Sequence, residues 1–339
     1  MNAALRRLAP IVLFAVAASP AWAQKTELLV YTALETDQLK AYTESFAKQN
    51  PNIELKFVRD STGVITAKLL AEKANPQADA ILGVAASSME IFKAEGMLAP
   101  YAPVGFKTLN RKFSEAGNPP AWVGQDVFAA VVCYNTVEGQ KKGIPKPETW
   151  ADLIKPVYKG QVTMPNPASS GTGFFDVSAW LQTMGEAGGW KYMDALHENI
   201  AQYTHSGSKP CRQAGAGEFV VGISFDFRGN DVKAKGAPVE LVFPKEGLGW
   251  DLEAAGIVRT TKKMDAAKKL MDWVATKEAN EAYSKNFAIV AHPDVKPVLA
   301  YVPADLERRL IRNDFAYAAK NRDRILAEWQ KRYAEKSEK

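Results

Sequence analysis

The chain has 339 residues, of which 47% are hydrophobic and 24% are charged, which is ordinary for a soluble globular protein and enough for two separate cores. The formal net charge is +5, and it falls to +3, with 41 basic and 38 acidic residues, when Arg6 and Arg7 are left out. This surplus is too weak to indicate nucleic-acid binding. The composition also excludes the collagen, coiled-coil and disordered classes.

The first 23 residues have the pattern of a secretory signal peptide. Two arginines precede an apolar run at 11–18 and an A-x-A cleavage site at 21–23. The run is too short to cross a bilayer as a helix. We therefore expect residues 1–23 to be removed, and the mature chain to begin near Gln24 and to act in the periplasm.

Predicted strands and helices alternate at the start of the mature chain. The strand at 28–31 is apolar throughout, as in a parallel sheet that is buried on both faces. Apolar residues recur at helical spacing over 36–49, and Asn50-Pro51 ends that helix. A second strand, a second helix and a third strand follow, at 53–58, 63–73 and 78–83. The order β-α-β-α-β predicts the start of an open, doubly wound sheet.

The pattern pauses at 100–120, and a second α/β unit follows. Its predicted strands are at 127–134, 161–163, 202–204, 220–225 and 239–243. Its predicted helices are at 150–154, 173–184, 190–198 and 209–216, and later helices are at 264–276, 279–285 and 314–333. We expect two α/β lobes joined by a hinge: a first lobe at 24–125, a second at 126–246, and a return to the first lobe with the C-terminal helices at 247–339. A ligand would bind at the carboxyl ends of the strands, in the cleft between the lobes.

Two loops that precede predicted helices are candidates for an anion site. Ser61 and Thr62 come just before the first of these helices. Ser170, Gly171 and Thr172 come before the long helix of the second unit. Hydroxyl groups and free N–H groups at a helix start bind anions, and glycine allows close approach. The alternative for both loops is an ordinary capped turn.

Two carboxylates at strand ends are candidates for binding a cation. The loop of Thr32 and Glu35 follows the first strand, and Asp226 lies between two phenylalanines after a later strand. An acid beside aromatic rings suits a primary ammonium group, although both acids could instead cap helices. Tyr203 and His205, in a further strand-end loop, could also face the cleft. Together these residues indicate a small zwitterion with a phosphonate at one end.

Two cysteines, Cys133 and Cys211, lie in the second predicted lobe. An exported protein with two cysteines can form a disulfide, and we expect one here. The alternative is two buried thiols. No histidine lies near either of them in a nucleophile motif.

The mature chain resembles the periplasmic binding proteins of the ferric-iron and polyamine type, a branch of the type II solute-binding fold. The landmarks are the segments 30–32, 170–173, 206–207 and 217–223. More narrowly, the segments 31–35, 206–212 and 224–230 resemble 2-aminoethylphosphonate-binding proteins. The resemblance implies a monomer that binds 2-aminoethylphosphonate by closing a hinge and delivers it to the permease subunits of an ABC importer.

Iron-binding relatives hold the metal with a histidine, a glutamate and a tyrosine pair. This sequence has Glu35 at the first-loop position and Phe225-Asp226-Phe227 in place of the tyrosines, so we expect neither a metal nor a cofactor. Those relatives use the anion loop for a synergistic phosphate, which implies that the loop here could hold a phosphonate. By position, Ser87 is a further possible contact.

Other functions fit the sequence less well. No G-x-S-x-G elbow, zinc motif or supported triad is present, so we expect no enzymatic activity. The same fold could bind a polyamine, thiamine, a sugar phosphate or inorganic phosphate. A polyamine would need acids at both ends, and phosphate alone would leave the two acids without a cation. A docking or signalling role at a membrane receptor also stays open.

Overall fold

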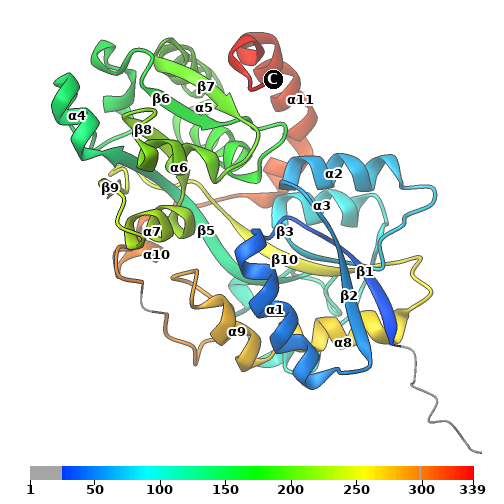
Figure 1. Ribbon diagram of the computed structural model, residues 1–339. Helices are drawn as coiled ribbons and strands as arrows, with labels where there is room; N and C mark the ends of the chain where they lie inside the picture. The colour runs from blue at the N-terminus through cyan, green and yellow to red at the C-terminus, as the bar shows by residue number, and fades with distance from the viewer. Residues whose placement is uncertain (1–24, 298) are drawn as a thin grey trace, which may run out of the picture.

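The computed structural model describes residues 25–297 and 299–339, so the predicted signal peptide lies outside the described residues. Its secondary structure is an α/β arrangement of two lobes around one curled sheet (Figure 1). Over the described residues, the main path of the sheet runs β2-β1-β3-β10-β5-β8-β6-β7, with the short strands β4 and β9 paired to β10 and β5. The predicted fold class is confirmed.

The first lobe contains the parallel strands that open the chain. Its strands are β1 (Thr26–Thr32), β2 (Ile53–Arg59), β3 (Ala80–Ala85) and β4 (Leu98–Ala99). Its first helices are α1 (Thr36–Gln49), α2 (Thr62–Ala71) and α3 (Ala86–Ala94). Tyr42 and Phe46, one helical turn apart on α1, are buried against Trp273, which fixes this helix on the core.

Two long antiparallel strands connect the lobes. They are β5 (Val123–Asn135) and β10 (Trp250–Val258). Residues 123–129 of β5 pair with β10, and residues 130–134 pair with β8. Because β5 is continuous across both halves of the sheet, the predicted lobe boundary at residue 126 falls inside a strand.

The second lobe contains the strands β6 (Val162–Pro165), β7 (Ile200–Thr204), β8 (Val221–Phe225) and β9 (Val239–Val242). Its helices are α4 (Thr136–Lys142), α5 (Gly171–Asn199), α6 (Lys209–Ala216) and α7 (Asp226–Ala234). The two helices predicted at 173–184 and 190–198 are the two arms of α5. They meet at Gly185, whose φ of 74° interrupts the helical backbone.

The chain then returns to the first lobe and ends beside the second. Helices α8 (Met264–Val274) and α9 (Lys277–Tyr283) cover the first lobe, and α10 (Leu306–Arg309) and α11 (Phe315–Tyr333) follow. Helix α11 packs against both α3 and α5, so it spans the two lobes (Figure 1). Single 3₁₀ turns lie at Phe106–Thr108, Arg111–Phe113, Ala151–Ile154, Pro156–Tyr158 and Ala334–Lys336.

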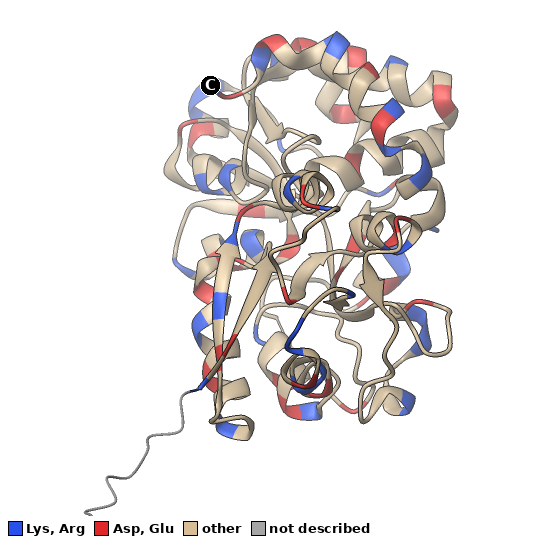
Figure 2. Ribbon diagram, turned by 90° about the vertical axis from the view of Figure 1, so that its right-hand side faces the viewer, with Lys and Arg blue, Asp and Glu red and all other residues tan. Residues whose placement is uncertain are grey.

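Acidic and basic residues are interspersed over the helices in the view of Figure 2 rather than gathered by sign. This agrees with the weak surplus of positive charge in the sequence. Among the described residues, no helix combines the length and the apolar character needed to span a bilayer.

Several elements differ from the sequence-based prediction. Helices α3 and α7 were not predicted, because each follows its strand directly, at Ala85–Ala86 and Phe225–Asp226, with no turn residue to mark the change. Helix α4 and strand β10 were also missed. Strand β10 contains two acids and a glycine, which have low strand propensity. The helix predicted at 150–154 is only a 3₁₀ turn.

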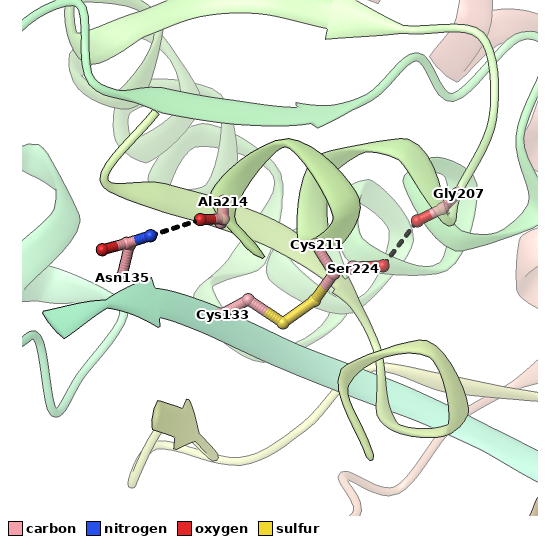
Figure 3. Close-up of a disulfide and its surroundings, with 6 residues drawn as sticks. All are labelled: Cys133, Asn135, Gly207, Cys211, Ala214 and Ser224. Carbon is pink, nitrogen blue, oxygen red and sulfur yellow. Dashed lines mark hydrogen bonds between the residues drawn. A yellow bond between two sulfur atoms is a disulfide. The ribbon is translucent and has the colours of Figure 1, made fainter. Parts of the chain in front are cut away.

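The structure joins Cys133 of β5 to Cys211 of α6 by a disulfide, with the two Cα atoms 5.3 Å apart (Figure 3). Neighbouring contacts hold the same junction: the Asn135 side-chain amide donates to the Ala214 carbonyl at 2.7 Å, and the Ser224 hydroxyl donates to the Gly207 carbonyl at 2.6 Å. Both cysteines are fully buried. The bond therefore ties α6 to a strand that crosses between the lobes.

Removal of this disulfide should destabilise the protein. The bond closes a loop with a sequence separation of 78 residues. Replacing both cysteines by alanine should lower the free energy of unfolding by about 2–5 kcal/mol. Urea unfolding of the variant and of the wild type, each with and without reductant, checks this. An unfolding midpoint that neither the substitution nor the reductant changes would show that the bond does not stabilise the fold.

Candidate ligand-binding site

A small cavity of about 40 Å³ lies between the two lobes. Its lining comes from six strand-end or helix-start segments of both lobes and from the two crossing strands. The lining residues are Ala33, Glu35, Arg59, Ser61, Thr62, Gly83, Ala85, Phe128, Ser170, Gly171, Thr172, Gly207, Phe225 and Glu253. One buried water occupies a cavity of roughly 10–15 Å³, so this cavity has room for about three water-sized groups.

Two helix N-termini converge on this cavity from opposite lobes. Ser61 is the N-cap of α2, and Ser170 is the N-cap of α5, where its hydroxyl accepts from the Gly173 N–H at 3.4 Å. A Cβ atom added to Gly171 would lie 2.9 Å from the Thr62 hydroxyl, which shows how closely the two helix starts approach each other. The first N–H groups of a helix lack intrahelical acceptors and lie at the positive end of its dipole. The arrangement is therefore suited to an anion.

Gly207 and Arg59 complete the polar side of the cavity. A Cβ atom on Gly207 would lie 2.5 Å from the Thr172 hydroxyl, so only glycine leaves this hydroxyl free at the cavity wall. Arg59 ends β2, and its Nε donates to the Leu34 carbonyl at 2.9 Å. This bond holds the guanidinium group at the cavity. Arg59 adds a positive charge that the sequence-based prediction did not include.

Glu35 lines the cavity, but its carboxylate already faces three guanidinium groups. Its oxygens lie 3.5 Å from Arg59 Nη2, 3.6 Å from Arg212 Nη2 and 3.3 Å from Arg228 Nη2, and the Ser208 hydroxyl also donates to it. Arg212 and Arg228 belong to the second lobe, and Arg228 is only 1% exposed. In this arrangement Glu35 links the lobes, and its charge is compensated before any ligand arrives.

Glu253 is the acid of the cavity wall that has no basic partner among the described residues. Its side chain is 9% exposed, and Oε2 has no hydrogen-bond partner. Burial raises the pKa of Glu253 well above its usual range; a side-chain hydrogen bond with Asp126 lowers it in part, and the charges of Glu35 and Asp226 raise it further. Phe128 and Phe225, whose ring centroids lie 6.2 Å apart, form an aromatic wall of the same cavity.

Five of the predicted contacts do not line this cavity. Asp226 and Ser87 lie in the first turns of α7 and α3, where both are buried: Asp226 Oδ1 accepts from the Ala129 N–H at 3.0 Å, and the Ser87 N–H donates to Asp251 at 3.4 Å. The hydroxyl of Thr32 accepts from the Leu34 N–H within its own loop. These three side chains shape the surrounding loops and strands.

Tyr203 and His205 lie beside a separate, open surface hollow. The Tyr203 hydroxyl is 2.9 Å from His197 Nδ1, and His205 Nε2 is 3.0 Å from Asp60 Oδ1, which is a contact between lobes. In the described parts of the chain, no group of three or more His, Cys, Asp or Glu side chains is placed to hold a metal ion.

The predicted residues on the cavity are thus Glu35, Ser61, Thr62 and the Ser170–Thr172 loop, and the missed ones are Arg59 and Glu253. The predicted strand ends at residue 58 and the predicted loop begins at residue 60, so Arg59 belongs to neither of them. Glu253 lies on β10, which was not predicted as a strand. The single acid in the short apolar segment 252–255 is the signal that could have found it.

Residues 75–319 match the family of bacterial extracellular solute-binding proteins. The chain belongs to this family. An uncharacterised protein of Haemophilus influenzae is 31% identical over 260 residues, which cover 76% of this chain and 75% of that protein. A protein of Salmonella typhimurium, named as a candidate 2-aminoethylphosphonate-binding periplasmic protein, is 25% identical over 310 residues, 86% of this chain and 87% of its own.

Among solved structures, the periplasmic binding protein AfuA from Actinobacillus pleuropneumoniae, with fructose-6-phosphate bound, is similar to this chain. The TM-score is 0.83 and the sequence identity is 29%, over 92% of this chain and 99% of AfuA. This similarity confirms the two-lobe solute-binding fold.

Proposed function

We propose that this protein is the extracytoplasmic binding component of an ABC importer and that it captures a small organophosphonate, 2-aminoethylphosphonate. Its phosphonate group would lie between the N-termini of α2 and α5, within reach of Arg59. The observation that carries the proposal is the convergence of Ser61, Thr62 and the Ser170–Thr172 loop on one small cavity. Helix starts, hydroxyls and a guanidinium group are the donors that bind phosphonate and phosphate oxygens.

The related proteins support the shared chemistry of this head group. The Salmonella relative is named for a phosphonate, and AfuA was solved with a sugar phosphate, so both ligands carry a tetrahedral phosphorus oxyanion. A sugar phosphate is therefore the second candidate, and AfuA favours it. The cavity of about 40 Å³ is smaller than either ligand, so the lobes would have to part to admit one, and 2-aminoethylphosphonate, with fewer than half the non-hydrogen atoms of a hexose phosphate, needs the smaller opening.

Ligand capture would proceed by hinge closure. The contacts that join the lobes beside the cavity include a hydrogen bond from the Gly63 N–H to the Ser169 carbonyl at 2.8 Å. Asp60 also contacts His205, and Glu35 contacts Arg228. A ligand that binds both helix starts stabilises the same closed form. We expect a monomer in the periplasm that delivers the closed complex to the permease subunits.

The anion site can be tested by removing its two hydroxyls from the second lobe. The double substitution Ser170→Ala with Thr172→Ala should weaken 2-aminoethylphosphonate binding by about 100-fold or more, since each hydrogen bond to a charged group contributes about 1.5–3 kcal/mol. Calorimetric titration measures the affinity. Ser284→Ala, which removes an exposed hydroxyl of the first lobe, is the control and should bind like the wild type. Unchanged affinity in the double variant would exclude this loop as the anion site.

A thermal-shift comparison separates the two candidate ligands. A solute that binds only the folded protein raises its melting temperature in proportion to the logarithm of concentration over Kd. We expect 2-aminoethylphosphonate to raise it more than fructose 6-phosphate at equal concentration, and putrescine to leave it unchanged. A larger rise in melting temperature with fructose 6-phosphate than with 2-aminoethylphosphonate would favour the sugar phosphate.

A further inference from the structure

Two acids lie directly opposite each other on the strands that connect the lobes. Asp126 of β5 and Glu253 of β10 are cross-strand partners, and the register of this pair shifts immediately after Glu253. The Cβ atoms of opposite residues in an antiparallel pair are about 4.5–5.5 Å apart, and like charges there are destabilising. Both side chains are buried, so water would screen two negative charges there only weakly, and the pKa of each carboxyl is raised well above its usual range.

In the part of the chain that the structure describes, no basic side chain compensates these acids. Among the described residues, neither Asp126 nor Glu253 takes part in an ion pair. No other described group donates a hydrogen bond to the Asp126 carboxylate oxygens or to Glu253 Oε2, and the two carboxyls can only share a proton with each other. Asp226 Oδ2, on the neighbouring α7, is also without a partner. Burying unpaired carboxylates costs several kcal/mol, and such a cost is typical of functional sites. The arrangement therefore indicates a cationic partner that the chain itself does not provide.

The ligand cavity gives access to this pair. Glu253 is part of the cavity wall, together with the rings of Phe128 and Phe225. A carboxylate beside aromatic rings binds a primary ammonium through a charge-assisted hydrogen bond and cation–π attraction. Glu35, the other acid of the wall, already faces three guanidinium groups. Among the lining acids in the described part of the chain, Glu253 is thus the one without a basic partner.

We infer that Glu253, supported by Asp126 behind it, is the specificity-determining residue that binds the ammonium group of the ligand and selects aminophosphonates over phosphonates without an amine. This inference rests on the proposed binding of a phosphonate and assigns the other end of the same ligand. Neither acid pairs with a basic residue within 25–297 and 299–339, so the ammonium group of the ligand would supply the opposite charge.

The test is a comparison of 2-aminoethylphosphonate with ethylphosphonate, which has the same phosphonate and no amine. Calorimetric titrations use the wild type, Glu253→Gln and Asp126→Asn. The wild type should bind the amino compound about 100-fold more tightly, as expected for a buried charge pair. Glu253→Gln should abolish most of this preference by weakening the amino compound alone, and Asp126→Asn should reduce it in the same direction. Glu240→Gln, on a surface ion pair, is the matched control and should keep the full preference.

The outcomes separate this inference from the proposed function. If Glu253→Gln keeps the wild-type preference for 2-aminoethylphosphonate over ethylphosphonate, Glu253 does not bind the ammonium group. The same follows if the folded variant loses affinity for both compounds equally. If the wild type binds neither compound, the phosphonate proposal fails and the inference fails with it. Melting curves show that each variant folds, and Asp126→Asn tests the same assignment should Glu253→Gln not fold.

Discussion

Replacing Gly63 by alanine is expected to lower the affinity for the ligand by about 100-fold or more while leaving the protein folded. A Cβ atom at Gly63 would lie 2.0 Å from the Ala168 carbonyl oxygen and 2.8 Å from the carbonyl carbons of Ala168 and Ser169. These are backbone atoms of the other lobe, so no side-chain rotation relieves the clash. The variant lobes could not close, and the ligand would lose its hydrogen bonds to one of the two helix starts, each a contribution of about 1.5–3 kcal/mol.

Two measurements check this prediction. Calorimetry gives the affinity, and small-angle X-ray scattering with and without ligand reports whether the lobes close. Gly188→Ala is the matched control, because a Cβ atom there would meet only Met184 Cβ at 3.4 Å, an ordinary contact. If Gly63→Ala bound the ligand as tightly as the wild type and became as compact on binding, closure of the lobes would not bring α2 against residues 168–169.

Replacing Asp226 by asparagine is expected to stabilise the ligand-free protein at pH 8 and to lose this advantage at pH 4. Burial raises the pKa of Asp226 to about 7, although the N–H groups of Ala129 and Phe227 lower it in part. The unfolded carboxyl titrates near pH 3.8. Between these two values the folded state holds a proton that the unfolded state has lost, so the stability of the wild type relative to the variant falls as pH rises.

The expected size of this change is about 4 kcal/mol between pH 4 and pH 8, since one pKa unit corresponds to 1.36 kcal/mol. Urea unfolding of the wild type and of Asp226→Asn at several pH values measures it. The exposed Asp294→Asn serves as control, and its stability difference from the wild type should not vary in this way. The burial argument would be contradicted if the difference in free energy of unfolding between the wild type and Asp226→Asn did not change with pH, or changed in the opposite direction.

The sequence predicts the elements with strong local signals well. Helices α1 and α6 have the predicted bounds, because apolar spacing defines α1 up to Asn50-Pro51 and because α6 ends at Gly217 in the left-handed conformation. Strand β10 was missed because its pairing partners, β3 and β5, are distant in sequence and its own residues have weak strand preference. Tertiary pairing, not local propensity, makes it a strand.

The candidate site was predicted only where a helix start marked it. Ser61 and Ser170 each precede a helix, and both lie on the cavity. Asp226 also starts a helix, but that helix follows β8 without a turn and buries the carboxylate away from the cavity. Glu253 could not be found in this way, because a mid-strand residue reaches a site only through the register of the sheet. The ligand-binding roles of all these residues stay predictions.

Calorimetric titration of the ligand-stripped mature protein with 2-aminoethylphosphonate tests the central claim most directly. Inorganic phosphate, fructose 6-phosphate and putrescine are the comparison solutes. We expect tight binding of one 2-aminoethylphosphonate per chain, and weaker or no binding of the other three. A protein that ignores 2-aminoethylphosphonate and binds putrescine would contradict both the anion site and the phosphonate proposal, while leaving the family assignment intact.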